Sequence, residues 1–317
     1  MKPILCFGEL LIDFLNFNTT EEGGFQLPEF RQYPGGAPAN VAAAVGRLGA
    51  PARFLGQVGN DRFGQFLTEA MKQMQVDMQF LKVHPTAHTP LAYVFLDADG
   101  DRSFEFLRHQ SADVLMTPDD LPDAAFADAG LFHFCSNTLT DEAIARTTEV
   151  AITKARAAGA TISFDVNLRH NLWPNTRVDA DVIGQFLMLA DIVKVSKEEA
   201  DWIEQGGFPM KDWLATVTAI WVTDGGGDIR VVTRQGEHRL TPPKVKVVDT
   251  TAGGDAFTGG LLMALNGRDL AQLTDKDIAS VTAFAAACGG VAVSRAGALP
   301  SLPTWSDVEQ VWPEQRR

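Results

Sequence analysis

The segment DTTAGGDAFTGG, from Asp249 to Gly260, combines residue types that could carry out chemistry on a phosphate group. Glycines and alanines surround one carboxylate, Asp255, and an apolar run suited to a helix follows directly. A glycine-rich turn before a helix can direct backbone N–H groups at an anion, at the positive end of the helix dipole. A carboxylate at the same place could accept the proton of a reacting hydroxyl. The segment alone leaves a second interpretation open, a tight turn with a capping aspartate.

The glycine spacing in this segment differs from that of the common nucleotide-binding loops. Gly254 and Gly259 have the spacing of a Walker A loop, but Gly260 stands where that motif requires lysine. Neither this segment nor TDGGGD (223–228) contains the G-x-G-x-x-G fingerprint of dinucleotide-binding folds. The sequence therefore favours neither a P-loop nor an NAD-linked enzyme.

A second glycine-rich segment, YPGGAPANVA (33–42), places Asn40 on a helix face made otherwise of alanine and valine. A buried amide must find hydrogen-bond partners. The hydroxyl groups of a ligand or a backbone carbonyl would serve equally well, so the residue is a candidate with both roles open.

These candidates need a scaffold, and the hydrophobic pattern predicts one. ILCFG (4–8) is typical of a buried parallel strand, and 37–49 is expected to be a helix. From residue 130 onward strands and helices alternate, which predicts βαβ units and a parallel sheet covered by helices. The fold class is therefore α/β, with a doubly wound, mostly parallel sheet. The later helices are expected at 140–158, 179–190, 197–204, 254–266 and 275–294.

Two early segments interrupt this pattern. Residues 19–36 are polar and rich in turn residues, and are expected to form a loop or a small hairpin that projects outward. Residues 91–108 are typical of two strands joined by DADGD. We therefore expect one continuous domain over 1–317, with a β insertion built from about 11–35 and 89–108.

Polar residues cluster directly after the predicted strands, where doubly wound sheets bind ligands. Strand ends are often polar in any protein, but the whole set favours a ligand site at this edge of the sheet. Its members are Gly8, Glu9, Asp13, Ser136, Asn137, Asp165, Asn167, Arg169, Ser196, Glu199, Thr223, Asp224 and Gly225.

The composition argues against several classes of function. The 317 residues are 45% hydrophobic and carry a net charge of −13, so neither nucleic acid nor an anionic membrane is an expected partner. No apolar segment approaches the roughly 18–20 residues that span a bilayer. The three cysteines form no C-x-x-C pair and are expected to be reduced core residues, which indicates a cytoplasmic protein.

Taken together, these motifs resemble those of the PfkB carbohydrate kinase family, also called the ribokinase family. The family implies a doubly wound sheet flanked by helices, with the β insertion as a lid over a sugar. The resemblance covers nearly the whole chain and rests on GGAPANVAAAVGRLG (35–49), GQVGNDRFG (56–64), VSKEEA (195–200), VTDG (222–225), DTTAGGDAFTGGLL (249–262) and AVSRAGALPSLP (292–303).

The resemblance implies a catalytic role for the segment described first. Asp255 matches the catalytic base of the family, and the backbone of Ala252, Gly253 and Gly254 matches its anion hole. Arg169 matches a residue near the transferred phosphate, where a guanidinium group suits anionic oxygens.

On the sugar side, Asp13, Gly36 and Asn40 match positions that bind hydroxyl groups. The residues themselves suggest that Phe104 packs against the apolar face of a sugar, although packing within a hairpin would explain it as well. Arg108 could bind hydroxyls or, in a related enzyme, a carboxylate.

The resemblance also implies ATP and Mg²⁺ as cofactors. The nucleotide would lie along Ser196, Thr223, Gly225 and Gly254, and Glu199 would hold Mg²⁺ through water. A K⁺ ion would brace the turn, although an ordinary helix end near Gly297 remains the alternative. The positions that match its ligands are Asp249, Thr251, Ala292, Arg295, Gly297 and Ser301.

GELLIDF (8–14) and DRSFEFLRHQSAD (101–113) are most similar to bacterial fructokinases, which implies ATP-dependent phosphorylation of D-fructose to fructose 6-phosphate. A 2-keto-3-deoxygluconate kinase or another sugar kinase of the family is the alternative, and a non-catalytic sugar-binding protein is a remote one. Nucleotide preference is less defined, because Ser196 replaces a common asparagine of the family. The sequence leaves open whether the lid covers one active site or forms a homodimer with the lid of a second subunit.

Overall fold

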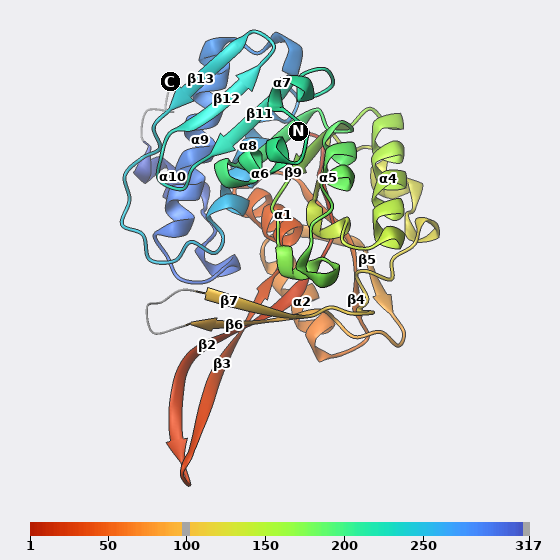
Figure 1. Ribbon diagram of the computed structural model, residues 1–317, viewed down its shortest axis with the longest axis vertical. Coiled ribbons are helices and arrows are strands. Elements are labelled where there is room, and N and C mark those ends of the chain that lie inside the picture. The colour runs from red at the N-terminus through yellow and green to blue at the C-terminus, as the bar shows by residue number, and fades with distance from the viewer. Residues whose placement is uncertain (97–101, 313–317) are drawn as a thin grey trace.

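The computed structural model of the protein describes residues 1–96 and 102–312, which form two β-sheets and their surrounding helices (Figure 1). The larger sheet has nine strands in the order β13-β12-β11-β10-β9-β8-β1-β4-β5. Neighbours from β5 to β11 are parallel, whereas β12 and β13 add an antiparallel edge. The expected α/β fold class is confirmed. The strands are β1 (Ile4–Phe7), β4 (Ala52–Gly59), β5 (Val76–His84), β8 (Leu131–Cys135), β9 (Thr161–Asp165), β10 (Ile192–Ser196), β11 (Ala219–Thr223), β12 (Ile229–Thr233) and β13 (Gly236–Leu240).

Helices cover both faces of this sheet because successive strand side chains point into two different cores. In β1, Ile4 and Cys6 belong to one core, and Leu5 and Phe7 belong to the other. The first core includes α1, α2, α8 and α9, and the second includes α3 to α7. The helices are α1 (Ala37–Arg47), α2 (Arg62–Gln73), α3 (Asp123–Phe126), α4 (Glu142–Ala157), α5 (Ala180–Leu187), α6 (Lys197–Gln205), α7 (Met210–Trp213), α8 (Gly253–Leu265), α9 (Asp275–Val293) and α10 (Trp305–Val311).

The smaller sheet has four strands, in the order β3-β2-β6-β7. They are β2 (Leu11–Glu22), β3 (Phe25–Gly35), β6 (Leu91–Leu96) and β7 (Arg102–Leu107). β2 and β3 form a hairpin that projects far from the body of the molecule (Figure 1). The β insertion predicted for about 11–35 coincides with these two strands. The loop or small hairpin expected for 19–36 is the outer part of one longer hairpin, in which strands of 12 and 11 residues meet at a tight Gly23-Gly24 turn. Both strands predicted within 91–108 are confirmed, and the DADGD connection (97–101) lies outside the described residues.

Helix α9 corrects the expectation that no segment is long and apolar enough to span a bilayer. In the described part of the chain it is the one helix that passes this test of length and composition. The helix packs against α8, α10 and β13, and 61% of its most apolar 18-residue stretch is buried inside the protein. We therefore interpret α9 as a helix of the protein core.

The strand order reverses beside β1, which pairs with β4 on one side and with β8 on the other. Doubly wound sheets bind ligands in the crevice outside the carboxyl ends of the strands at such a reversal. The topology therefore predicts a ligand site at the residues that follow β1 and β8.

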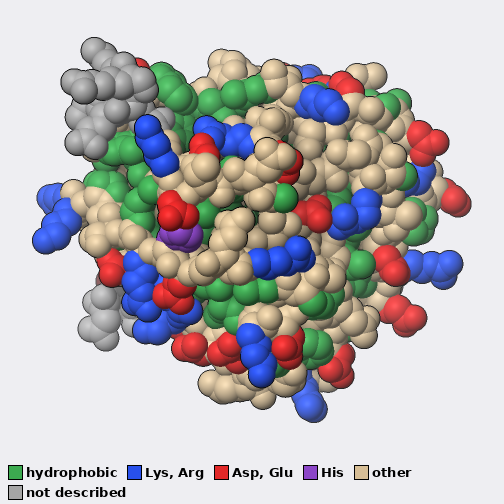
Figure 2. Space-filling view, turned by 90° about the horizontal axis from the view of Figure 1, so that it is seen from above, with side chains coloured by type: hydrophobic (Ala, Val, Ile, Leu, Met, Phe, Trp, Pro, Cys, Tyr) green, Lys and Arg blue, Asp and Glu red, His purple; other side chains and the backbone are tan. Residues whose placement is uncertain are grey.

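The surface charge gives no sign of a polyanionic partner on the face that Figure 2 shows. Lys and Arg side chains are interspersed with Asp and Glu there, and do not gather into a basic patch (Figure 2). Together with the net charge of −13, this is the opposite of the basic surface that binds nucleic acid.

Candidate active site

A cavity of about 310 Å³ lies at the carboxyl ends of β1 and β8. Its walls come from β2 and β7 of the smaller sheet, from the starts of α1 and α8, and from the segments that follow β1, β8 and β9. The structure therefore brings together residues from both glycine-rich segments and from the predicted β insertion. The predicted site residues that line this cavity are Asp13, Gly36, Asn40, Phe104, Arg169, Thr251 and Asp255.

Asp255 lies in the first turn of α8 and is only 7% exposed. Its Oδ2 accepts a hydrogen bond from Asn40 Nδ2 at 2.8 Å, and its Oδ1 accepts a longer one from Asn167 Nδ2 at 3.5 Å. Ala252 is the N-cap of α8, and no side chain caps this helix. The alternative of a capping aspartate is therefore wrong, because the carboxylate of Asp255 lies on the cavity wall instead.

Burial is the main cause that raises the pKa of Asp255 to about 7. The hydrogen bond from Asn40 and the charges of Arg169 and Lys194 lower this pKa, whereas the carboxyl group of Asp165 raises it. A pKa near neutrality suits a general base, which must take up a proton and release it again at ordinary pH.

The turn before α8 consists of small residues because its surroundings leave little room. A Cβ atom on Gly253 would lie 2.5 Å from Val293 Cγ1, and one on Gly254 would lie 3.2 Å from Lys194 Nζ. The first N–H groups of a helix have no acceptor within the helix, although Gly253 N–H here donates to Thr250 O at 3.3 Å. The turn thus has the backbone donors that an anion hole requires.

A buried ion pair beside this turn escaped the sequence analysis. Lys194 Nζ lies 3.2 Å from Asp165 Oδ1, and the Thr258 hydroxyl donates to Asp165 Oδ2 at 3.1 Å. Burial lowers the pKa of Lys194. The charges of Asp165, Glu199 and Asp255 raise this pKa by more. A protonated amine therefore lies beside Gly254. The lysine was overlooked because it stands within IVKVS, a strand that is otherwise almost entirely apolar.

Buried acceptor atoms around the cavity lack partners. Glu9 Oε2, Asn40 Oδ1 and Asn137 Oδ1 have no hydrogen-bond partner among the described residues. Glu9 Oε1, in contrast, accepts from Asn137 Nδ2 and from Ala37 N–H, both at 2.9 Å. Buried polar groups are normally paired, so these atoms indicate where the hydrogen-bond donors of a ligand would lie. Glu9 and Asn137 belong to the polar strand-end residues that predicted a ligand site, although no specific contact was assigned to either.

Two further walls of the cavity depend on backbone and ring geometry. Gly36 has φ 107°, and a Cβ atom there would lie 2.4 Å from the carbonyl oxygen of Glu9. Phe104 and Phe106 stack with ring centroids 6.1 Å apart, and both line the cavity. Phe104 therefore presents an aromatic surface to the site in addition to packing within the smaller sheet.

Arg108 does not line this cavity, and its contact with a substrate stays a prediction. Its Nε donates to Asp113 Oδ2 at 2.6 Å, its Nη1 to Thr140 Oγ1 at 3.2 Å and its Nη2 to Asn137 O at 2.8 Å. The guanidinium group is buried within these contacts. Arg108 thus holds the backbone carbonyl of Asn137 in place, and all three nitrogens of its guanidinium group already donate to protein acceptors.

The residues predicted to bind the nucleotide lie at the ends of neighbouring strands. Ser196 and Thr223 are register partners on β10 and β11, and Gly225 follows in the turn after β11. The Ser196 hydroxyl accepts from Glu199 N–H at 3.2 Å and so caps α6. The Glu199 carboxylate accepts from the N–H groups of Ser196 and Leu168, both at 2.7 Å. Each carboxylate oxygen has a further lone pair, so Glu199 can also accept a bond from a water molecule.

The predicted K⁺ ligands lie on two segments that the carboxylate of Asp249 connects. Its Oδ1 accepts from Thr251 N–H at 2.8 Å, and its Oδ2 accepts from Gly297 N–H at 2.9 Å. The described residues contain no cluster of three or more His, Cys, Asp or Glu side chains that could hold a metal. A cation here would therefore depend mainly on carbonyl oxygens, which hard cations accept as ligands. The remaining predicted ligands belong to the second segment: Ala292, Arg295 and Ser301.

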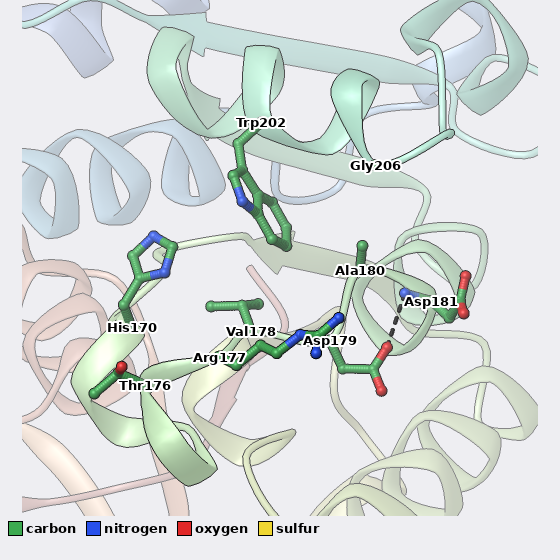
Figure 3. A pocket seen from close by; sticks show the side chains of 9 residues that line it. All are labelled: His170, Thr176, Arg177, Val178, Asp179, Ala180, Asp181, Trp202 and Gly206. Atoms are coloured by element: carbon green, nitrogen blue, oxygen red, sulfur yellow. Dashed lines mark hydrogen bonds between the residues drawn. The ribbon is translucent and has the colours of Figure 1, made fainter.

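A larger hollow of about 660 Å³ lies between residues 170–181 and helix α6 (Figure 3). His170 and Trp202 meet there edge to face, with ring centroids 6.1 Å apart. Asp179 accepts the N–H of Asp181 at 3.0 Å and so caps α5. In the described residues that line this hollow, no buried side-chain N or O atom lacks a partner. The smaller cavity at Asp255 is therefore the better candidate for a ligand site.

Comparisons with known proteins show which family the chain belongs to. The family model described as pfkB family carbohydrate kinase matches residues 1–305. The chain is 38% identical to fructokinase-1 of Zea mays over 97% of each chain. It is similar to the structure of a fructokinase with bound ATP from Xylella fastidiosa, with a TM-score of 0.92, 38% identity and 99% of both chains covered. A fructokinase double mutant of Vibrio cholerae with bound fructose, ADP and potassium ion gives a TM-score of 0.85 at 31% identity over 98% of both chains.

The family match includes both glycine-rich segments and every residue that lines the cavity at Asp255. The relatives also span nearly the full length of the chain, so the match is not confined to a shared fragment. The resemblance seen in the sequence is confirmed: the chain belongs to the pfkB family of carbohydrate kinases, phosphotransferases that act on a sugar hydroxyl.

Proposed function

We propose that this enzyme transfers the γ-phosphoryl group of ATP to a primary hydroxyl of D-fructose and forms fructose 6-phosphate. The observation that carries the proposal is the buried carboxylate of Asp255. It lies in the first turn of α8 and lines the same cavity as hydrogen-bond acceptors that have no partner among the described residues. The fructokinases among the relatives, two of them with bound ATP or with fructose and ADP, support the choice of substrates.

In this mechanism Asp255 accepts the proton of the attacking hydroxyl. The hydroxyl oxygen forms a bond to the γ-phosphorus while the bond from that phosphorus to the ADP oxygen breaks. The N–H groups of the turn formed by Ala252, Gly253 and Gly254 bind the oxygens of the transferred group. The guanidinium group of Arg169 neutralises part of the same charge.

The sugar-binding residues are proposed from their places on the cavity wall. Asn40 donates to Asp255 and keeps its carbonyl oxygen for the ligand, and Asp13 and Gly36 line the same cavity. Phe104 packs against the apolar face of the sugar. Arg108 acts through Asn137, whose carbonyl oxygen it holds.

The nucleotide is proposed to lie along Ser196, Thr223, Gly225 and Gly254. Glu199 would hold Mg²⁺ through water, and Mg²⁺ would neutralise phosphate charge. A K⁺ ion would be bound by the carboxylate and carbonyl oxygens of the Asp249–Thr251 and Ala292–Ser301 segments. Its proposed effect is to hold the anion-binding turn in shape.

We further propose that residues 1–317 form one domain in which the smaller sheet acts as a lid. The exposed apolar side chains of the β2–β3 hairpin, Phe17, Phe25 and Leu27, favour a homodimer through the lids. Light scattering coupled to gel filtration tests this, and a monomer at micromolar concentration would contradict it. The free, buried cysteines Cys6, Cys135 and Cys288 favour a cytoplasmic location.

A coupled ADP-release assay tests the substrate. Fructose, ribose, 2-keto-3-deoxygluconate, adenosine and fructose 6-phosphate are compared as acceptors, each with and without K⁺. We expect fructose to give the highest kcat/KM. Activity with the keto acid and none with fructose would refute the proposed substrate and leave the family assignment untouched.

The rival substrates have less support from the geometry. The case for 2-keto-3-deoxygluconate was that Arg108 could bind its carboxylate, but this guanidinium group is already bound to Asp113. A non-catalytic sugar-binding protein would be expected to have lost the base or the anion-binding turn. This chain retains both Asp255 and the turn of small residues.

A further inference from the structure

We propose that Glu9 is a sugar-binding, specificity-determining residue, whose free carboxylate oxygen bonds a substrate hydroxyl beside Asn137. This inference rests on the proposed function as a sugar kinase and deepens it. Neither residue was predicted to contact the sugar.

The topology places these two residues at the favoured position of the fold. Glu9 follows β1 and Asn137 follows β8, the parallel neighbours beside which the strand order reverses. Both side chains line the cavity that contains Asp255. They therefore lie where doubly wound sheets bind their ligands.

Only one of the two carboxylate oxygens of Glu9 has hydrogen-bond partners among the described residues. Oε1 has a structural task, because it accepts from Ala37 N–H at the start of α1 and from Asn137 Nδ2. Oε2 is buried and has no partner among the described residues, and the whole residue is only 2% exposed. A purely structural glutamate would not need to leave this oxygen unpaired on a cavity wall.

The neighbouring groups define the ligand that would fit. Asn137 donates its amide to Glu9 and Asn40 donates its amide to Asp255, so each points a carbonyl oxygen elsewhere, and both oxygens are unpaired. Three acceptors around one cavity require a ligand with several hydrogen-bond donors, such as the hydroxyl groups of a neutral ketose. The carboxylate of a sugar acid would meet these acceptors without a donor of its own.

Arg108 does not change this conclusion. Its buried guanidinium group contacts Asn137. All three of its nitrogens already donate to protein acceptors, on Asp113, Thr140 and Asn137. Glu9 and Asn137 therefore favour hydroxyl groups of the substrate over a carboxylate group at this end of the cavity.

The test combines Glu9→Gln with fructose analogues that each lack one hydroxyl group. The variant keeps the size of the side chain and replaces Oε2 by an amide nitrogen. We expect its KM for fructose to rise by about tenfold or more, since an amide donor replaces the acceptor oxygen that the substrate hydroxyl would meet, with a smaller change in kcat. One deoxy analogue should bind the wild type and Glu9→Gln equally weakly, because it lacks the hydroxyl that meets Oε2. Calorimetric titration with fructose gives the same comparison without turnover.

The controls separate this inference from the proposed function. Glu9→Asp retains the carboxyl group but withdraws both of its oxygens, and should show coupling with the same hydroxyl. Thermal unfolding identifies a variant that fails to fold. An unchanged KM in both variants, or an equal loss for fructose and every deoxy analogue, would overturn the role of Glu9. If the wild type does not phosphorylate fructose, the proposed function fails, and the same series on the sugar that it does phosphorylate decides the role of Glu9.

Discussion

At the scale of single residues, the site depends on a carboxyl group that its surroundings make difficult to ionise. Asp255 is buried, and it is held by Asn40 and by Asn167 rather than by the backbone of its own helix. Its near-neutral pKa follows mainly from that burial. The same environment that suits a base also makes this residue unfavourable for stability when it is ionised.

Replacing Asp255 by asparagine should remove catalysis and spare binding. The amide cannot accept the proton of the sugar hydroxyl, so we expect kcat to fall by about 10²- to 10⁴-fold. ADP release measures turnover, and calorimetry should still detect fructose binding. A folded Asp255→Asn variant with near-wild-type turnover would contradict the assignment of the base.

The same variant should be more stable than the wild type at alkaline pH. Folding raises the pKa of Asp255 from an ordinary value near 3.9, so its favourable contribution is complete below that value and is lost as the pH rises through about 7. We expect a gain of about 1–3 kcal/mol in the free energy of unfolding at pH 8, and a smaller gain at pH 5.5. Urea unfolding measures both, with Asp201→Asn on the exposed surface of α6 as the matched control substitution.

The activity of the wild type should follow the ionisation of this carboxyl group. kcat/KM for fructose, at low ATP, should rise with pH up to about 7 and level off above it. Below that pH the expected slope is about tenfold per unit, since only the ionised form can act as a base. A pH-independent rate between 5.5 and 8 would contradict this assignment.

Some residues of the site could be predicted from the sequence because their surroundings are local. Asp255 and its turn are contiguous, so the residue types suggested an anion site and a base, and the family resemblance assigned these roles. The partners of Arg108 could not be predicted, because Asp113 is brought to it by the fold of the loop that follows β7. Lys194 was missed because one charged residue within an apolar strand gives no sign of the ion pair that it forms.

At the scale of elements, α1 links the two glycine-rich segments of the site. It begins beside Glu9, whose carboxylate accepts the N–H of Ala37, and its second turn carries Asn40 to Asp255 on α8. Asn40 and Asp255 are 215 positions apart in the chain, so only the packing of α1 on α8 makes their contact.

Two glycines that flank α1 allow a matched test of this role. In Gly36→Ala the new Cβ would lie 2.4 Å from Glu9 O, whereas at Gly49, also with positive φ, it would meet nothing within 4 Å. Backbone strain alone should destabilise Gly49→Ala by about 1–2 kcal/mol. Gly36→Ala should lose more stability and should also raise KM for fructose by about tenfold or more, because the wall of the sugar cavity shifts. Equal stability losses and an unchanged KM in both variants would contradict this role of α1.

The regular strand pairing in the outer half of the β2–β3 hairpin is the feature of the elements that the sequence defined least. Most residues of its outer half are exposed on both faces, so it lacks the alternating apolar pattern that identifies a half-buried strand. The sheet strands and most helices do bury one face, and their periodicity made them predictable.

At the scale of the whole molecule, alternating strands and helices predicted the doubly wound sheet, but not which residues would meet across it. The reversal beside β1 brings Glu9 and Asn137 into contact across 128 positions of the chain. Spacing along the sequence cannot show such a contact, although the position of both residues after strands was a usable signal.

Ligand binding should stabilise the domain as one unit. We expect a single unfolding transition that shifts to higher temperature with fructose and an ATP analogue. A ligand at 100 times its Kd should raise the free energy of unfolding by about 2.7 kcal/mol. Scanning calorimetry measures the shift, and 2-keto-3-deoxygluconate serves as the comparison ligand. Two separate transitions would contradict the proposal of one domain over residues 1–317.

The identity of the product tests the central claim most directly. ³¹P NMR of a reaction containing the enzyme, MgATP and D-fructose identifies which hydroxyl receives the phosphoryl group. A base at Asp255 that acts on fructose as proposed predicts fructose 6-phosphate, formed in equal amount to ADP. Fructose 1-phosphate as the product, or free phosphate in place of a sugar phosphate, would contradict this account.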